Sequence, residues 1–345
     1  MDCFDTVIIN IHVIKLFSIH NIMSIIYRKG KAPTFTYSSK KGKITNKGVL
    51  EKIKKYRIPP AWKNVEITLD KDLVAIGIDD AGRKQYVYSE KHTEKKRVKK
   101  YCGLIDFIHA IPKIRKDIEN KLKKTAMSKD KLIAILLNII IICSFRIGTE
   151  GNRDKYNSQG ISTITKKEVK VGNKNVVIDF IGKKQVRNTC KIVDPKIVRL
   201  LKDIYKKRGA KDTIFNMGGN KVTIHDVNTY LKGFNDNVTS KVFRTWLANT
   251  KFVDKLVYQI KKQGADISSE NKRLKLVREV KKEVSQEMHH TPAVCSKSYL
   301  TNEPINLFIE SPDQYKKTIM KNYKKKGGNM ESEMSLLHYL RVFCK

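Results

Sequence analysis

The stretch LIAILLNIIIICSF, at residues 132–145, places the strongest constraint on how this chain can fold. It is apolar on all sides of a helix, so other parts of the protein must surround it. It is also shorter than the roughly 20 apolar residues that cross a bilayer, and Asn138 interrupts it. The stretch therefore predicts a buried core helix, with a sizeable domain built around it and no membrane span.

The spacing of apolar residues predicts two parts of different secondary structure. Residues 30–90 contain short runs rich in β-branched and aromatic residues, and one helix is expected at 49–56 before the Pro59-Pro60 pair. From residue 104 the spacing is helical, except that 166–193 alternates like a three-stranded meander. We therefore predict an α+β fold: a small β-rich N-terminal domain and a larger, mainly α-helical domain with a small β meander.

The charged run KHTEKKRVKKYCG, at 91–103, predicts the domain boundary. The expected organisation has four parts: a loosely attached extension at 1–22, a β-rich domain at 23–100, a mainly helical domain at 104–313 and a basic, amphipathic helical tail at 314–345. Residues 1–22 have neither a basic start nor a small-residue cleavage site, so they make a poor signal peptide.

The charge of the chain favours a polyanionic partner. Lys and Arg number 71 against 34 Asp and Glu, which leaves a formal net charge of +37. Such an excess destabilises a fold through self-repulsion unless a polyanion covers it. Nucleic acid is favoured, because each neutralised phosphate releases condensed counterions. From charge alone, a ribosome-like structural protein or a membrane-surface binder remains an alternative.

The cysteines are scattered along the chain and none forms a C-x-x-C pair. They are Cys3, Cys102, Cys143, Cys190, Cys295 and Cys344. This spacing argues against a zinc ribbon or a disulfide framework, and it favours an intracellular, reducing compartment.

Five side chains offer the groups that metal-free cleavage of a DNA strand requires. They are Arg146 in FRIG, Lys183 at the tip of a predicted hairpin, Arg244 in KVFRT, and His290 and Tyr299 in HTPAVCSKSY. A tyrosine is a suitable nucleophile for a reversible cleavage, arginine forks hold phosphate oxygens, and a lysine beside other cations can act as a general acid. Each residue alone is more often structural or solvated, and spacing by itself does not join them.

The motif GRKQYVYS, at 82–89, offers a second set of contacts to DNA. Arg83 and Gln85 can hydrogen-bond base edges in a major groove, and Tyr86 and Tyr88 alternate onto one face of a strand. The same pattern also describes an ordinary exposed edge strand whose tyrosines pack on their neighbours.

Taken together, the motifs resemble the type IB DNA topoisomerases, most closely their poxvirus-like branch, which includes giant-virus enzymes. The motifs are RIPPAW, GRKQYVYS, FRIG, IGKKQV, KVFRT and HTPAVCSKSY, between about residues 30 and 300. This resemblance implies a tyrosine-recombinase-like catalytic fold and a monomer that encloses double-stranded DNA. It implies supercoil relaxation through a 3′-phosphotyrosyl link, without metal, ATP or other cofactor. If the source is viral, virion and infected host cell are the expected locations.

The resemblance also implies a role for each candidate residue. Tyr299 is the nucleophile, and Arg146, Arg244 and His290 stabilise the transition state. Lys183, together with Arg146, protonates the leaving 5′ oxygen. Contacts to DNA are implied for Arg83, Gln85, Tyr86, Tyr88 and Lys241. One departure from the viral pattern is Lys184, where an aspartate is common.

Two other functions remain open from the sequence. A tyrosine recombinase shares the Arg, Lys, His and Tyr arrangement, but it commonly has a histidine where this chain has Lys241, and its N-terminal domain is usually helical. A non-enzymatic, architectural DNA-binding protein would use the same charge without forming a covalent adduct with DNA.

Overall fold

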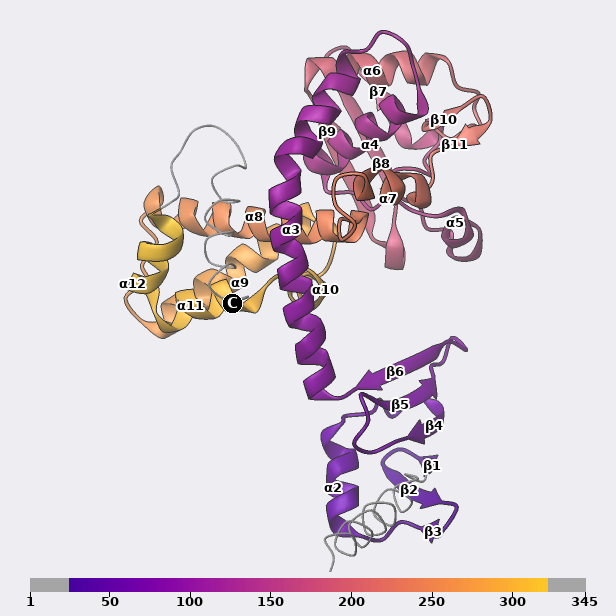
Figure 1. The fold of residues 1–345 in the computed structure, drawn as a ribbon, viewed down its shortest axis with the longest axis vertical. Coiled ribbons are helices and arrows are strands. Elements are labelled where there is room, and N and C mark those ends of the chain that lie inside the picture. The colour runs from indigo at the N-terminus through magenta and orange to yellow at the C-terminus, as the bar shows by residue number, and fades with distance from the viewer. Residues whose placement is uncertain (1–24, 322–345) are drawn as a thin grey trace, which may run out of the picture. The chain divides into compact units, whose positions relative to one another are not determined.

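The computed structural model describes residues 25–321, which divide into two compact units between Lys99 and Lys100 (Figure 1). Each unit is described by itself. The extension expected at 1–22 lies outside the described residues, as does residue 322 onward of the expected tail.

The first unit is an antiparallel sheet with one helix. Its strands lie in the order β3-β2-β1-β4-β5-β6. Their bounds are β1 Ile26–Lys31, β2 Thr34–Ser39, β3 Gly42–Lys43, β4 Lys63–Ile67, β5 Leu73–Ile78 and β6 Lys84–Tyr88. Helix α2, Lys47–Lys55, has Asn46 as its N-cap and buries Ile53 in a small core with Val65, Ile67 and Val74. The predicted strands and helix of this unit are present. Strand β1 was not predicted, because most of its residues are polar or charged.

The charged run at 91–103, where the sequence predicted the domain boundary, is helical. It lies inside helix α3, Glu90–Lys123. The hydroxyl of Ser89 accepts a hydrogen bond from the amide of His92 and so caps this helix. Lys, Arg and Glu are strong helix formers, and their charge is compatible with an exposed helix surface. The division between the two units therefore falls within a continuous helix.

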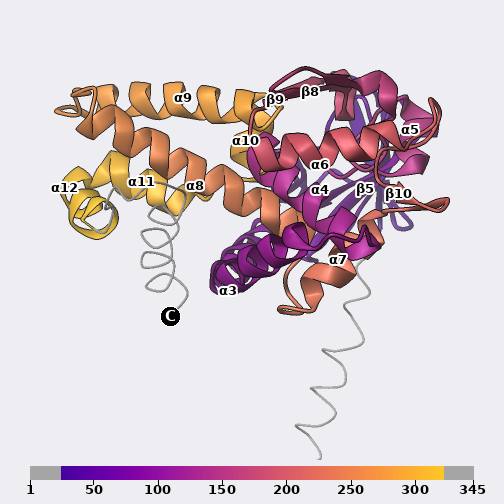
Figure 2. The ribbon, with the colours of Figure 1, turned by 90° about the horizontal axis from the view of Figure 1, so that it is seen from above.

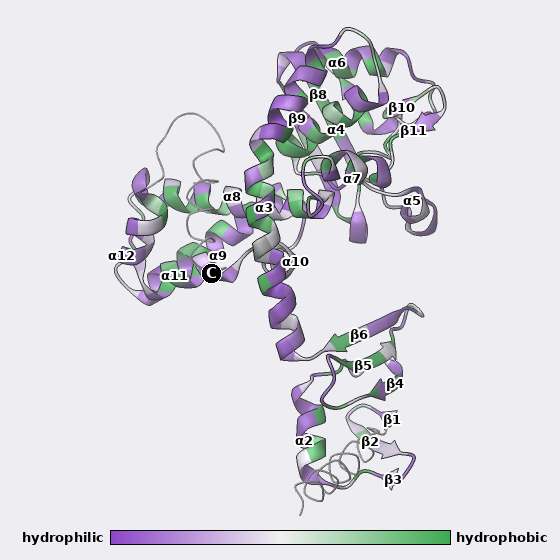
Figure 3. Ribbon diagram, in the orientation of Figure 1, coloured by the Kyte–Doolittle hydropathy of each residue, from purple (hydrophilic) through white to green (hydrophobic). Residues whose placement is uncertain are grey.

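The second unit is built around α4, Lys129–Cys143. This helix is the predicted core helix: nearly all its apolar residues are buried, and Figure 3 shows it as predominantly hydrophobic. The predicted three-stranded meander is also present, as β7 Val169–Val171, β8 Val176–Ile181 and β9 Arg187–Ile192. Around these lie α5 Glu150–Tyr156, α6 Pro195–Lys206, α7 Ile224–Lys232 and a hairpin of β10 Asn216–Met217 and β11 Asn220–Lys221. Within residues 25–321, none of the helices is long and apolar enough to cross a membrane.

The remaining helices form a second group in this unit, and Figures 1 and 2 show them side by side. They are α8 Ser240–Lys261, α9 Glu270–Glu287, α10 Pro292–Ser298, α11 Asn302–Glu310 and α12 Pro312–Tyr315, followed by a π-helical turn at Lys316–Met320. The face of α9 predicted to be apolar, at Val277, Val280 and Val284, is buried. Tyr315 and Ile319 are also buried, so the described part of the tail packs onto this unit.

One disulfide corrects the interpretation of the cysteines. Cys143, at the end of α4, is bonded to Cys190 on β9, with their Cα atoms 5.6 Å apart. The two residues are 47 positions apart, and only the packing of α4 against the meander brings them together. No spacing rule could have paired them. The expectation of a reducing compartment stays a prediction.

Candidate active site

Tyr299 lies at the end of a short helix. Helix α10 begins at Pro292, and the hydroxyl of its N-cap, Thr291, accepts a hydrogen bond from the amide of Val294. A proline at the first helical position has a suitable φ and no amide to satisfy. Tyr299 is the C-cap, and its amide donates to the carbonyl of Cys295. The nine-residue separation of His290 and Tyr299 is therefore bridged by this helix.

Arg244 is almost fully buried, with 5% of its surface exposed. It lies in the second turn of α8. One terminal nitrogen, Nη1, donates to the carbonyl of Ser144, and Nη2 donates to the carbonyl of Met288 at 3.0 Å. Nη2 is also 2.8 Å from Nε2 of His290. Burial lowers the pKa of Arg244 to about 10, so the guanidinium remains charged at neutral pH.

The ring of Tyr299 lies directly against this arginine and His290. The Tyr299 and His290 rings stack at 4.7 Å between centroids with planes 7° apart, and Cζ of Arg244 is 5.3 Å from the Tyr299 centroid. Burial raises the pKa of Tyr299, but the charges of Arg244 and Arg146 and hydrogen bonds from both outweigh it, so this pKa lies below its usual value. Two guanidinium groups thus favour the phenolate form of Tyr299.

His290 is buried and neutral. Burial lowers its pKa to about 3, and the positive charges of Arg244 and Arg146 lower it in the same direction. Its Nδ1 is buried without a hydrogen-bond partner in the described part of the chain, and so is Nε of Arg244. Unpaired buried polar atoms are uncommon in proteins, and here they lie beside the tyrosine. A phosphate oxygen could accept a hydrogen bond from each.

Arg146 reaches the site from an extended segment that follows α4. Its carbonyl accepts a hydrogen bond from the amide of Ile161 at 2.8 Å, and the carbonyl of Ile147 accepts one from Ser162. Glycine is required where these two segments meet. A Cβ on Gly160 would lie 2.2 Å from the carbonyl oxygen of Ile147, and Gly148 has a φ of +100°. The glycine of FRIG thus permits the close backbone approach that holds Arg146.

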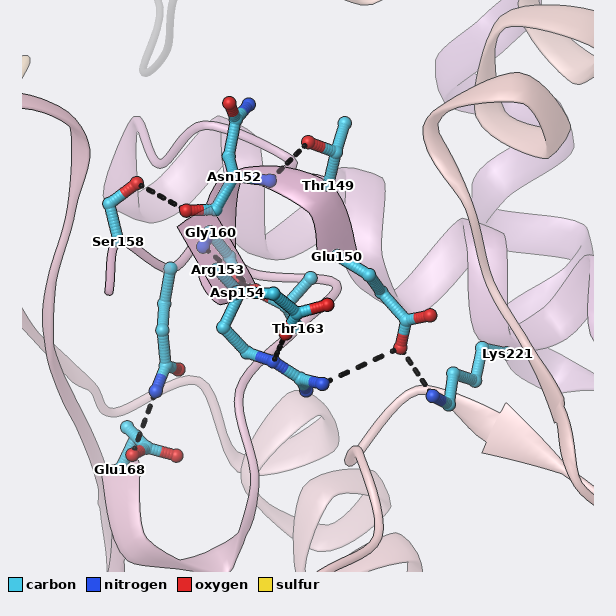
Figure 4. A network of polar contacts seen from close by, with 11 residues as sticks. Thr149, Glu150, Asn152, Arg153, Asp154, Ser158, Gly160, Thr163, Glu168 and Lys221 are labelled. Atoms are coloured by element: carbon cyan, nitrogen blue, oxygen red, sulfur yellow. Dashed lines mark hydrogen bonds and ion pairs between the residues drawn. The ribbon is translucent and has the colours of Figure 1, made fainter. Parts of the chain in front are cut away.

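Helix α5 follows this segment and is anchored by polar contacts, which Figure 4 shows. Thr149 caps it, and Glu150 forms ion pairs with Arg153 and with Lys221 of β11. Beyond the helix, Gln159 donates to Glu168 at 3.1 Å. These contacts connect the residues after Arg146 to the rest of the second unit.

Within residues 25–321, Lys183 forms no hydrogen bond with the other four candidates. It is exposed in the turn between β8 and β9, as predicted, next to Lys184 and Gln185, which both have positive φ. The structure therefore brings Arg146, Arg244, His290 and Tyr299 together and leaves Lys183 on the surface of the meander.

The expected DNA contacts in the first unit lie on and beside β6. Tyr86 and Tyr88 are exposed on one face of this strand, and their ring centroids are 6.5 Å apart. Asp79 accepts hydrogen bonds from Arg83 and from Gln85, at 2.9 and 2.8 Å, and so holds both side chains. In the second unit, Lys241 is exposed in the first turn of α8.

Asn249 is a residue of this site that the sequence had not suggested. It is buried on α8, and its amide nitrogen donates to the carbonyl of Tyr299 at 2.9 Å. Its amide oxygen accepts from both the backbone and the hydroxyl of Thr301. A buried asparagine with this many contacts fixes the backbone at Tyr299 and two residues beyond it. No local pattern in the sequence marks it, because its partners Tyr299 and Thr301 lie 50 and 52 positions further along the chain.

Comparison with known proteins identifies the family of this chain. The model of the eukaryotic DNA topoisomerase I catalytic core matches residues 89–326, and that of the bacterial DNA topoisomerase IB N-terminal domain matches residues 34–79. The chain belongs to the type IB DNA topoisomerase family. The resemblance inferred from the motifs is therefore confirmed.

Several DNA topoisomerases are similar to large parts of the chain. A DNA topoisomerase 1B of Acanthamoeba polyphaga mimivirus is 31% identical over 307 residues, which covers 85% of this chain and 90% of that protein. The DNA topoisomerase 1B of vaccinia virus strain Copenhagen is 23% identical over 231 residues, covering 66% and 70%. The DNA topoisomerase 1 of Schizosaccharomyces pombe is 28% identical over 169 residues, covering 48% and 20%. The placement with giant-virus and poxvirus enzymes is thus supported.

Proposed function

We propose that this protein relaxes supercoiled double-stranded DNA by reversible cleavage of one strand through Tyr299. The observation that carries the proposal is the convergence of two arginines on one partly buried phenol, which lowers its pKa. The phenol oxygen attacks a backbone phosphorus, and a bond from phosphorus to Tyr299 replaces the bond to the 5′ oxygen. The free strand end swivels, and the 5′ oxygen then attacks to reverse the step.

In this mechanism each of the remaining side chains of the site has a defined role. Arg146 and Arg244 bind the two non-bridging oxygens, whose charge grows in the transition state. His290, being neutral, donates one further hydrogen bond to the phosphate. The phenol proton passes to solvent, and Lys183 supplies a proton to the departing 5′ oxygen. We infer that DNA binding brings Lys183 to the phosphate, as apo geometry often leaves catalytic contacts incomplete.

The rest of the molecule supports binding to duplex DNA. We propose that residues 23–100 form a DNA-binding domain that reads the major groove with β6, and that residues 104–313 form a catalytic domain with the tyrosine-recombinase-like fold. A single copy would enclose the duplex. The viral relatives favour an infected host cell, and the virion, as its location.

Changing Tyr299 to Phe tests the proposal. The variant keeps the ring and its stacking on His290 but has no oxygen to attack phosphorus. We expect no plasmid relaxation in EDTA and no covalent adduct, with duplex binding unchanged. Tyr258→Phe, at an exposed tyrosine on α8, is the matched control and should relax DNA like the parent. If Tyr299→Phe relaxes DNA at the parent rate, the assignment of the nucleophile is wrong.

The same assay separates the two rival functions. A tyrosine recombinase would need paired sites and assembly, so a dilute monomer would not relax a plasmid that lacks them. An architectural protein would bind DNA in both parent and variant without any adduct.

A further inference from the structure

His289 occupies a backbone position that glycine normally fills. The amide of His290 donates to the carbonyl of Ser285, and the amide of His289 donates to that of Gln286. This pair of hydrogen bonds ends α9 in a Schellman motif, whose residue after the C-cap takes a left-handed conformation. His289 has a φ of +54° there. A side chain in this region is unfavourable and persists where its surroundings compensate for it.

The compensating contacts of His289 all point toward the segment before Arg146. Its Nε2 lies 2.8 Å from the carbonyl oxygen of Cys143. Because a carbonyl oxygen only accepts, Nε2 must carry the proton and donate it. The ring also lies 5.1 Å from that of Phe145. The Phe145 ring packs in turn on Phe180 of β8, with 4.9 Å between ring centroids.

His289 and Arg244 bind the carbonyl groups of two neighbouring residues, Cys143 and Ser144. Cys143 and Ser144 end α4, where carbonyls have no partner within the helix. Nη1 of Arg244 donates to the carbonyl of Ser144, and Nε2 of His289 donates to the one before it. Ser144 itself has a φ of +57°, so the chain turns sharply there before it reaches Arg146.

We propose that His289 is a positioning residue, which sets the place of Arg146 by tying the end of α9 to the end of α4. His290 follows it directly, so one short segment binds the reacting phosphate and aligns the arginine across from it. This inference rests on the proposed function. Burial lowers the pKa of His289 as well, which keeps the ring neutral and its Nε2 proton available to Cys143.

Changing His289 to Gly separates positioning from simple support of the fold. Glycine adopts the left-handed conformation freely, so the variant should melt no lower than the parent while it loses the hydrogen bond to Cys143. We expect adduct formation at saturating enzyme to slow by roughly 10- to 100-fold, the usual effect of a small misplacement. Duplex affinity should stay within about threefold, since the affinity of a basic protein for DNA comes chiefly from its phosphate contacts elsewhere.

Two further variants serve as a partial rescue and as a control for His289→Gly. His289→Asn tolerates the left-handed conformation and keeps an amide donor, so it should recover part of the lost rate. Asn64→Gly, at a residue of the first unit with a φ of +50°, is the matched control and should leave the rate unchanged. Crystal structures of parent and His289→Gly give a readout that does not depend on activity, and we expect Arg146 displaced from Tyr299 in the variant.

Each outcome decides the proposal. Parent-like adduct formation by His289→Gly, or a slower rate that merely follows a lower melting temperature, would overturn the positioning role. So would an unmoved Arg146 in the crystal structure. If the parent itself forms no adduct, the proposed function fails, and the two crystal structures still decide whether His289 places Arg146.

Discussion

At the scale of single residues, His290 links the site to the pH dependence of stability. Its pKa is near 6.5 in an unfolded chain and about 3 in the folded protein. Between these values the unfolded chain binds more protons, so the free energy of unfolding falls as the pH falls from 6.5 toward 3. We expect His290→Gln to lose part of this fall, as measured by denaturant unfolding at pH 7.5 and pH 5. An equal loss in parent and variant would contradict a neutral, buried His290.

Lys183 is the candidate whose role depends most on bound DNA. If it protonates the leaving 5′ oxygen, then Lys183→Ala should slow cleavage by roughly 100- to 10,000-fold. A substrate with sulfur in place of that oxygen needs no proton on departure, because thiols ionise near pH 8.5. We expect the variant to cleave the sulfur substrate at nearly the parent rate. An equally large defect on both substrates would assign Lys183 to phosphate binding instead.

The residues that the sequence identified and missed differ in a physical way. Arg146, Arg244, His290 and Tyr299 lie in short motifs with distinctive neighbours, so the resemblance found them. Asn249 and His289 act through backbone carbonyls of distant segments. Such contacts depend on how helices pack and leave no pattern along the chain.

At the scale of elements, the meeting of the Arg146 segment with residues 160–162 offers a direct test. A methyl group on Gly160 would clash with the backbone of Ile147 and Gly148. We expect Gly160→Ala to lower the melting temperature and to slow cleavage, by displacing Arg146. Gly151→Ala is the matched control on α5, where a Cβ meets nothing within 4 Å. A parent-like Gly160→Ala would mean that the two segments can separate at no cost.

The elements themselves were largely predictable, for reasons that also explain the exceptions. The core helix α4 and the strands of the meander follow from apolar runs and alternation, which are local signals. The start of α3 was misplaced because the charged run at 91–103 was taken to mark only the domain boundary, although Lys, Arg and Glu favour helices. The Cys143–Cys190 bridge depends on packing between α4 and β9, which no local signal encodes.

At the scale of the whole molecule, the net charge of +37 predicts how binding responds to salt. Each phosphate contact contributes a slope of about −0.9 to the logarithm of affinity against the logarithm of salt concentration. We expect Arg83→Gln to make this slope shallower by about one, measured by fluorescence anisotropy on a short duplex. Tyr86→Phe removes no charge and should keep the slope. An unchanged slope for Arg83→Gln would mean that Arg83 touches no phosphate.

The hydrogen bonds of Asn249 have a mechanical consequence for the proposed cleaved state. If a strand end is esterified to Tyr299 as proposed, that side chain is the tether through which rotating DNA pulls on the protein. The force is transmitted to the backbone at Tyr299, and Asn249 forms hydrogen bonds there and with Thr301. In the proposed mechanism, this one buried amide would hold the backbone at Tyr299 against torque while the other strand end turns.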